Sequence, residues 1–347
     1  MKIHLFDDDP RLNSDSSYHL KMGSFGVVSH YMNRAFRDLG VYSSLDEAEW
    51  VGKCGSLDPQ FKYKDKKSFY INVWETNNTL PYYLLHHAQG QKMFGLCDKT
   101  ANLWRKYGFD ASTIYGGCDT EFWHQTKEKN KDQFIFCHVN HATVRSGLDV
   151  IIPAFCSKFK NNPNVKLVIK DSGGENLKLI NFIKSFECCN IEYINEFWTT
   201  EQIRDLYSES HACINLLRST SFGLPLLESS ACNTLCICGD VTPTNELVNS
   251  SYAKLIPPKG EIAIYPFINE VESRVGLKNY YGNFDYPEAP YFWDFDVETV
   301  AENLLNVYDN WNSYSTIDTR APIVENWKWK YTAVNLVKQL EKYELAS

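Results

Sequence analysis

Short apolar runs alternate along this chain with longer stretches whose apolar residues recur at helical spacing. A short apolar run between turn-forming residues predicts a buried strand, whereas a period of three to four residues predicts an amphipathic helix. In the first half, residues 1–6 and 68–76 predict strands, and residues 27–39 predict a helix that ends at Gly40. Residues 93–109 predict a further strand followed by a helix.

A second series of strands and helices begins near residue 134. Strands that alternate with helices indicate parallel sheets with crossover helices, so each half predicts one α/β domain. In open parallel sheets ligands bind at the carboxyl ends of the strands, and two such domains predict a binding cleft between them. The second series comprises predicted strands at 134–140, 165–171, 191–197, 212–217 and 234–240, and predicted helices at 147–159, 176–186, 200–210 and 223–232.

Two segments lack a clear apolar period. Residues 124–133 are polar and charged, so we expect a linker between the domains there. Residues 257–290 are rich in Pro, Tyr and Gly, and we expect an insertion or a long loop. The last predicted helix spans about 323–343 and is amphipathic.

Composition narrows the function classes. The formal net charge is −8, which argues against nucleic acid as the main ligand but leaves a local basic groove open. The 11 cysteines lie mostly in apolar stretches, as expected of reduced, buried thiols in a cytosolic protein. No signal peptide opens the chain and no run reaches the length of a membrane span. We therefore expect a cytoplasmic protein without integral membrane contact.

The stretch from Ser221 to Glu228 has the features of an anion-binding turn. Residues 221–225 predict a turn into a helix, whose free amides and positive dipole end suit a diphosphate. Gly223 lets the backbone approach a ligand, and Pro225 fits the first helical turn because its missing amide costs nothing there. Glu228 lies one turn further on, where its carboxylate can accept hydrogen bonds from two vicinal hydroxyls.

This stretch resembles the donor-binding signature of the retaining GT-B glycosyltransferases of family 4. Phe222, Gly223, Leu224 and Pro225 match its Phe-Gly-Leu-Pro, and Glu228 matches its second glutamate. The resemblance implies that the backbone at 222–224 holds the distal phosphate or the sugar of a nucleotide-sugar donor, and that Glu228 holds the ribose. The first glutamate of the signature is replaced by Thr220, which puts sugar recognition and stereochemical outcome in doubt.

The resemblance extends over most of the chain. It implies an α/β fold of the GT-B type, with two Rossmann-like domains whose parallel sheets face an interdomain cleft. The first, acceptor-side domain would comprise residues 1–128, and the donor domain residues 129–322. The closing segment, about 323–347, resembles the final helix that crosses back to the first domain.

Further residues match family positions near the donor. Arg145 matches a basic residue that neutralises the donor diphosphate, while the neighbouring lysine is replaced by Ser146. We expect Lys170 to supply the second cation. Phe197 or Trp198 is expected to stack on the nucleotide base.

Two residues of the first half match positions on the acceptor side. Gly26 belongs to the Gly23–Gly26 segment, which matches the family's first loop, near donor and acceptor. Glu75, at the carboxyl end of a predicted strand, is the best candidate for contact with the acceptor or the sugar. The catalytic prediction is therefore Glu75, Arg145 and Lys170, with a nucleotide sugar as co-substrate and no metal or other cofactor. Residues 7–9, three aspartates, are an alternative Mg²⁺ site.

Several alternatives stay open from the sequence. His138 and His141 leave a nucleotide-sugar epimerase of the same fold as an alternative. Thr220 leaves a catalytically weak sugar-nucleotide binder as another. A phosphorylase would need a cofactor lysine and a longer chain. The acceptor could be a glycan, a lipid, a protein or, as in phage-type DNA glycosyltransferases, a hydroxymethylated DNA base. A UDP- or GDP-sugar is the usual donor in the family.

Overall fold

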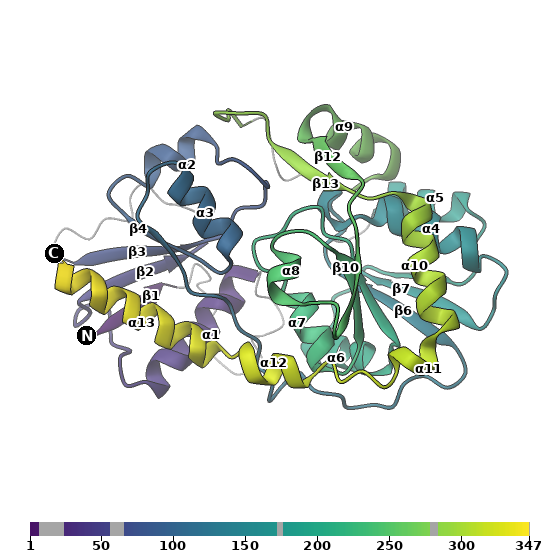
Figure 1. The fold of residues 1–347 in the computed structure, drawn as a ribbon, viewed down its shortest axis with the longest axis horizontal. Coiled ribbons are helices and arrows are strands. Elements are labelled where there is room, and N and C mark those ends of the chain that lie inside the picture. The colour runs from purple at the N-terminus through teal and green to yellow at the C-terminus, as the bar shows by residue number, and fades with distance from the viewer. Residues whose placement is uncertain (7–23, 56–65, 172–175, 278–283, 347) are drawn as a thin grey trace.

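The computed structural model describes residues 1–6, 24–55, 66–171, 176–277 and 284–346. They form two α/β domains that lie side by side (Figure 1). The first contains a parallel sheet of five strands in the order β1-β2-β3-β4-β5. Its strands are β1 (Ile3–Phe6), β2 (Trp50–Cys54), β3 (Lys67–Asn72), β4 (Lys92–Gly95) and β5 (Ala111–Thr113), and its helices are α1 (Ser24–Asp38), α2 (Tyr82–His87) and α3 (Asp98–Lys106).

The first sheet is covered on both faces, so its strands are apolar on both sides. One face carries the core cluster that includes Phe36 of α1, and the other carries Trp104 of α3. A parallel bridge joins Ile3 to Tyr42, which places the chain after α1 on the outer side of β1. The chain therefore reverses its direction of progress between β1 and β2, as in a Rossmann-like sheet.

The second sheet has six parallel strands in the order β11-β10-β9-β6-β7-β8. Connections run outward from β6 in one direction and from β9 in the other, so these two strands mark the topological switch point. The strands are β6 (Phe134–Val139), β7 (Val165–Lys170), β8 (Ile191–Ile194), β9 (Ala212–Asn215), β10 (Leu235–Gly239) and β11 (Ala253–Ile256). The helices are η3 (Val144–Ser146), α4 (Leu148–Phe159), α5 (Leu177–Ser185), α6 (Thr200–Glu209), α7 (Leu224–Ala231), α8 (Thr244–Leu247), α10 (Val297–Asp309) and α11 (Trp311–Tyr314).

For the segment 257–290, predicted as an insertion or a long loop, the long loop is wrong in the described part. It contains β12 (Gly260–Ala263), which pairs antiparallel with β13 (Tyr291–Asp294), and helix α9 (Ile264–Val275) between them. The helix forms because its apolar residues recur at helical spacing and are buried against the second core; they are Ile264, Ile268, Val271 and Val275. This short apolar period was missed because the segment as a whole is rich in Pro and Tyr.

The predicted last helix is two helices, α12 (Ala321–Asn326) and α13 (Trp329–Ala346). Helix α13 returns to the first domain and packs beside α1 (Figure 1). Trp329 stacks on Tyr31 with ring centroids 5.6 Å apart, while Leu336 and Leu340 are fully buried. The linker segment 124–133 has no helix or strand and lies between the two sheets in sequence.

All 11 cysteines are free thiols and only Cys189 is exposed, so the predicted buried thiols are confirmed. Within the described ranges, no helix combines the length and the apolar character that crossing a bilayer requires.

Candidate functional site

The two loops that start at the switch point of the second sheet are joined to each other. The loop after β6 carries Arg145 in η3, and the loop after β9 (residues 218–223, the β9–α7 loop) leads into α7. The Arg218 amide donates to the Arg145 carbonyl at 3.0 Å, and Arg145 Nη1 donates to the Ser219 carbonyl at 3.1 Å. Ligands bind at this place in doubly wound sheets, so the topology and the sequence motif point to the same site.

The β9–α7 loop places free amides at the start of α7. Gly223 has a φ of +93°, a backbone conformation that favours glycine, and it precedes the first helical residue Leu224. Within the described residues, no group accepts a hydrogen bond from the amides of Ser221, Phe222, Gly223 or Leu224. The loop thus has the local geometry expected of an anion-binding helix start.

A buried arginine that the sequence reasoning missed fixes this loop. Arg218 is 1% exposed and binds both carboxylate oxygens of Asp149, at 2.7 and 2.9 Å. It also donates to the Val144 carbonyl at 3.0 Å, which ties the β9–α7 loop to η3. A paired, bidentate arginine of this kind positions backbone rather than binding a ligand.

Glu75 and Arg145, predicted from separate halves of the chain, meet across the domain boundary. Their side chains form an ion pair of 2.9 Å, with Glu75 on the segment that follows β3. On the same segment the Trp74 carbonyl accepts a hydrogen bond of 2.6 Å from Ser221 Oγ. The first domain therefore packs directly on the β9–α7 loop.

Lys99 is a further contact between the domains, and no sequence signal had singled it out. It lies in the first turn of α3 and donates to Ser219 Oγ at 2.9 Å and to the Thr220 carbonyl at 3.0 Å. Its ammonium is buried, and desolvation lowers its pKa to about 8. The Thr220 backbone is therefore bound by a lysine of the first domain.

Lys170 lies at the end of β7, but its side chain binds backbone carbonyls rather than approaching Arg145. Its ammonium donates to the carbonyls of Asp171 and Glu196, at 2.7 and 2.8 Å, and lies 5.8 Å from the Trp198 ring centroid. Burial lowers its pKa. Lys170 thus ties β7 to the segment after β8, and the structure does not bring it into contact with Arg145.

The remaining donor-side residues occupy different environments. The Phe197 side chain is 57% exposed. Phe222 is buried between the domains, with its ring centroid 6.3 Å from that of Trp329, so only its backbone can face a ligand. Leu224 is partly exposed at the first position of α7. Glu228 is also partly exposed, and desolvation raises its pKa to about 8.

The prediction that Gly26 lies in a loop is wrong. It is the third residue of α1, which begins at Ser24. Gly23 and the aspartates at 7–9 fall outside the described residues. In the described part of the chain, no three His, Cys, Asp or Glu side chains are grouped so that they could hold a metal ion.

Glu246, which follows β10, caps a helix of the opposite domain. Its carboxylate accepts hydrogen bonds from the first two amides of α3, Asp98 at 2.7 Å and Lys99 at 3.2 Å. The contact satisfies two amides that the helix itself cannot bond. Beside it an interdomain cavity of about 540 Å³ is lined by Tyr115 and Trp327, among others.

Comparisons with known proteins agree with this arrangement. Residues 119–273 match the family model of the glycosyl transferases group 1, a match that spans less than half of the chain and contains Arg145 and the β9–α7 loop. No curated protein matches the sequence.

Solved structures share the fold at low sequence identity. A glycosyltransferase from Rickettsia africae superposes with a TM-score of 0.61 at 12% identity, covering 96% of this chain and 83% of that chain. Sucrose-phosphate synthase from Thermosynechococcus elongatus gives 0.60 at 12%, covering 94% and 83%. Anabaena HepE in complex with UDP-glucose gives 0.60 at 11%, covering 91% and 82%. The segment that carries the β9–α7 loop therefore matches the group 1 glycosyl transferases, and the chain is a glycosyltransferase with the GT-B fold.

Proposed function

We propose that this chain transfers a sugar from a UDP- or GDP-sugar to an acceptor hydroxyl, with retention of configuration. The observation that carries the proposal is the pairing of the free amides at Ser221–Leu224 with the guanidinium of Arg145 at one sheet switch point. Together they form a cationic setting for a diphosphate. A UDP-glucose complex of the similarly folded Anabaena HepE supports a nucleotide sugar as donor.

In the proposed reaction, the bond between the anomeric carbon and the diphosphate oxygen breaks while the acceptor oxygen bonds to the same carbon. The acceptor proton passes to the departing diphosphate oxygen on the same face, which accounts for retention. Arg145 and the loop amides stabilise the growing charge on the leaving group, with no metal cofactor required. Glu75, held beside Arg145, would orient the acceptor hydroxyl or the sugar.

Glu228 is the proposed ribose contact. Its carboxyl has no hydrogen bond to a described residue, although its pKa shift indicates a largely desolvated position. A pair of ribose hydroxyls would supply the missing partners. Lys170 and Phe197 remain proposed contacts to the diphosphate and the base; in the ligand-free chain Lys170 binds two backbone carbonyls and Phe197 is exposed.

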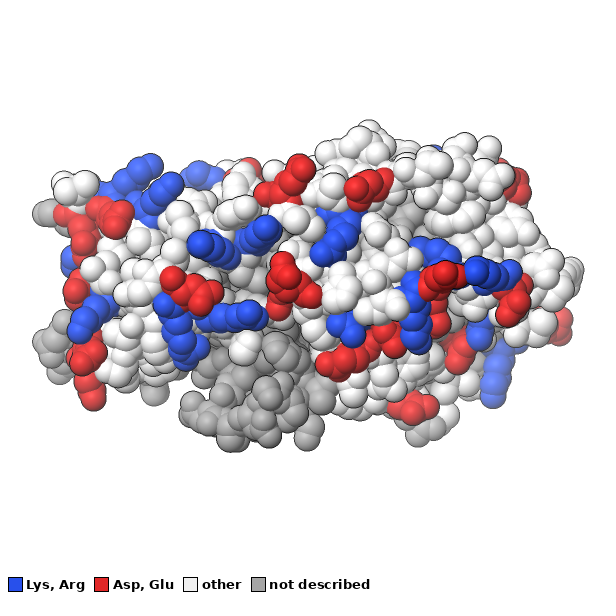
Figure 2. Space-filling view, turned by 90° about the horizontal axis from the view of Figure 1, so that it is seen from below, with Lys and Arg blue, Asp and Glu red and all other residues white. Residues whose placement is uncertain are grey.

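The alternatives differ in their support. His138 is fully buried in β6, where its Nδ1 lies 2.8 Å from the Ile214 carbonyl, so it does not favour an epimerase. Thr220, with its carbonyl bound to Lys99, favours a weak sugar-nucleotide binder as second candidate. A DNA acceptor gains no support from Figure 2, where the described Lys and Arg side chains are interspersed with Asp and Glu.

A thermal-shift panel of nucleotide sugars tests the proposal. A donor at 100 times its Kd stabilises the folded chain by about 2.7 kcal/mol, so the correct donor raises the unfolding midpoint. We expect Arg145→Ala and Glu228→Ala to lose most of this rise, and the exposed controls Arg274→Ala and Glu192→Ala to keep it. If both site variants keep the wild-type rise, the proposed donor site is wrong. Mass spectrometry of glycan, lipid, protein and hydroxymethylated DNA acceptors then identifies the product.

A further inference from the structure

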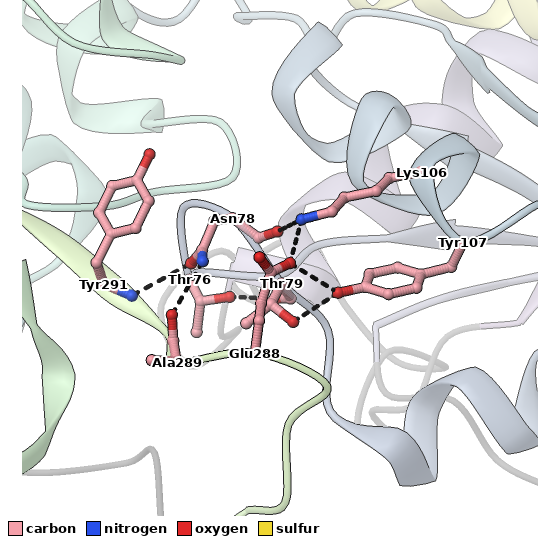
Figure 3. Close-up of polar contacts among 8 residues, drawn as sticks. All are labelled: Thr76, Asn78, Thr79, Lys106, Tyr107, Glu288, Ala289 and Tyr291. Atoms are coloured by element: carbon pink, nitrogen blue, oxygen red, sulfur yellow. Dashed lines mark hydrogen bonds and ion pairs between the residues drawn. The ribbon is translucent and has the colours of Figure 1, made fainter.

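A segment of the second domain crosses to the first domain beside the proposed donor site. After α9 the chain returns toward β13, and residues 284–291, here called the strap, lie against the loop 76–79 and against α2 and α3 (Figures 1 and 3). This contact is far from α12 and α13, where the chain itself crosses between the domains. The strap therefore adds to the non-covalent contacts that Glu75, Lys99 and Glu246 make between the domains.

Backbone and amide hydrogen bonds hold the strap to the first domain. Asn78 donates through Nδ2 to the Ala289 carbonyl at 3.0 Å and accepts at Oδ1 from the Tyr291 amide at 3.2 Å (Figure 3). The Tyr82 amide donates to the Asp285 carbonyl at 2.9 Å, and the Asn77 amide donates to the Tyr291 carbonyl at 3.3 Å. Asn78 thus meets the strap from both of its polar atoms.

Charge and aromatic contacts add to these bonds. Glu288 forms an ion pair with Lys106 and accepts a hydrogen bond of 3.1 Å from the Tyr107 hydroxyl, both at the end of α3 (Figure 3). Phe284 packs between two aromatic rings of the first domain, with its centroid 6.1 Å from Trp74 and 5.2 Å from Tyr83. The ion pair is about half exposed on both sides, so salt and substitution can weaken it without disturbing a core.

Strand β13, which begins where the strap ends, contacts the β9–α7 loop. The Arg218 carbonyl accepts hydrogen bonds from the Trp293 amide in β13 at 3.0 Å and from Asn77 Nδ2 of the first domain at 3.1 Å. One carbonyl of the proposed donor loop therefore receives a bond from each side of the domain boundary.

We propose that the strap is a latch that holds the two domains closed over the β9–α7 loop before any substrate binds. Asn78 and Glu288 are its positioning residues, acting on the closure of the domains and not on the reacting atoms. The effect of the latch on turnover rests on the proposed function, whereas its effect on closure does not. A weaker latch admits water to the donor site, so it raises donor hydrolysis relative to transfer.

Amide hydrogen exchange of the full, ligand-free chain measures closure directly. The variants are Asn78→Ala, Glu288→Gln and Glu288→Lys, the last of which opposes Lys106 with a like charge. The matched controls are Glu192→Gln and Glu192→Lys, because Glu192 forms an ion pair of 2.5 Å with Lys166 inside the second domain. The readout is exchange at the Asp98 amide, which Glu246 holds across the domain boundary at the opposite end of α3 from the strap contacts.

We expect exchange at the Asp98 amide to rise about two- to five-fold in Glu288→Gln, and further in Glu288→Lys. The loss of two hydrogen bonds in Asn78→Ala is expected to raise it about ten-fold. Neither Glu192 variant should change it, and the amides of β6 and β7 should stay protected in every variant. High salt should raise exchange in the wild type but not in Glu288→Gln.

Two outcomes would overturn the latch. In the first, only the strap and residues 76–83 exchange faster while Asp98 stays at the wild-type rate, which means that the strap frays without opening the domains. In the second, small-angle scattering finds the ligand-free wild type already as extended as Asn78→Ala. Both readouts are taken without a donor, so a failed donor screen would leave the latch result intact.

Discussion

Arg145 has its charge partner in the opposite domain, and this arrangement bears on how a donor would bind. Glu75 holds the guanidinium at 2.9 Å in the ligand-free chain. A diphosphate that binds Arg145 must compete with this carboxylate or share the guanidinium with it. The ion pair therefore preorganises Arg145 and at the same time opposes donor binding.

Replacing Glu75 by Gln separates these two effects. We expect Glu75→Gln to bind nucleoside diphosphate roughly two- to five-fold more tightly, because a partly buried ion pair no longer competes. Transfer should fall by about ten-fold or more if Glu75 orients the acceptor. Calorimetry gives the affinity and steady-state kinetics give kcat. Weaker diphosphate binding in this variant would mean that Glu75 supports Arg145 rather than competing with it.

Glu228 should make the stability of the chain depend on pH. Burial raises its pKa to about 8 in the folded state, so the folded chain holds a proton that the unfolded chain releases near the ordinary glutamate pKa. Its contribution is complete below pH of about 4.5 and is lost as the pH rises toward 8. Glu228→Gln stays neutral, so its unfolding free energy should fall less than that of the wild type between pH 5 and about 8. Urea titrations at several pH values measure this, and equal slopes would contradict it.

At the scale of elements, local patterns predicted most of the second domain. The apolar runs at 165–171 and 234–240 match β7 and β10, because a strand buried on both faces has a continuous apolar signal. Shorter strands such as β5, with three residues, escaped because they carry too few residues for a pattern. The break between α12 and α13 was also missed, because apolar residues such as Trp327 and Trp329 continue through it.

Gly147 should be essential for the loop that carries Arg145. Its φ is +71°, and a Cβ there would lie 2.6 Å from the carbonyl oxygen of Leu216, the residue that follows β9. Gly40 has a φ of +70° but open space around it, so an alanine there would add backbone strain without a steric clash. We expect Gly40→Ala to cost about 1 kcal/mol and Gly147→Ala about 3 kcal/mol, measured by urea unfolding. Equal costs would show that the loop adjusts freely.

At the scale of the molecule, contacts between the domains limited what the sequence could predict. Glu75 and Arg145 were found because each follows a strand, and parallel strands present their carboxyl ends at one edge. Lys99 and Arg218 were missed because their partners lie across a boundary whose orientation no local pattern encodes. The packing of the Phe222 side chain on the first domain was missed for the same reason.

Helix α13 makes the first domain depend on the end of the chain. Leu336 is fully buried on α13 in the core that α1 shares, so Leu336→Ala should destabilise the chain by about 2–5 kcal/mol. Hydrogen exchange should rise first in α1 and β1, while β6 and β9 stay protected. Lys338→Ala, on the exposed side of α13, should change stability by less than about 0.5 kcal/mol. An equal rise of hydrogen exchange in both sheets would contradict this order of opening.

The carboxylate of Glu246, a residue of the second domain, caps a helix of the first domain. Helix α3 begins with two amides whose acceptor comes from beyond residue 128, so the first domain expressed alone would start this helix without its acidic cap. The same dependence constrains chimeras. A hybrid that joins this first domain to the second domain of another glycosyltransferase would retain the start of α3 only if the incoming domain carries an acid at the place of Glu246.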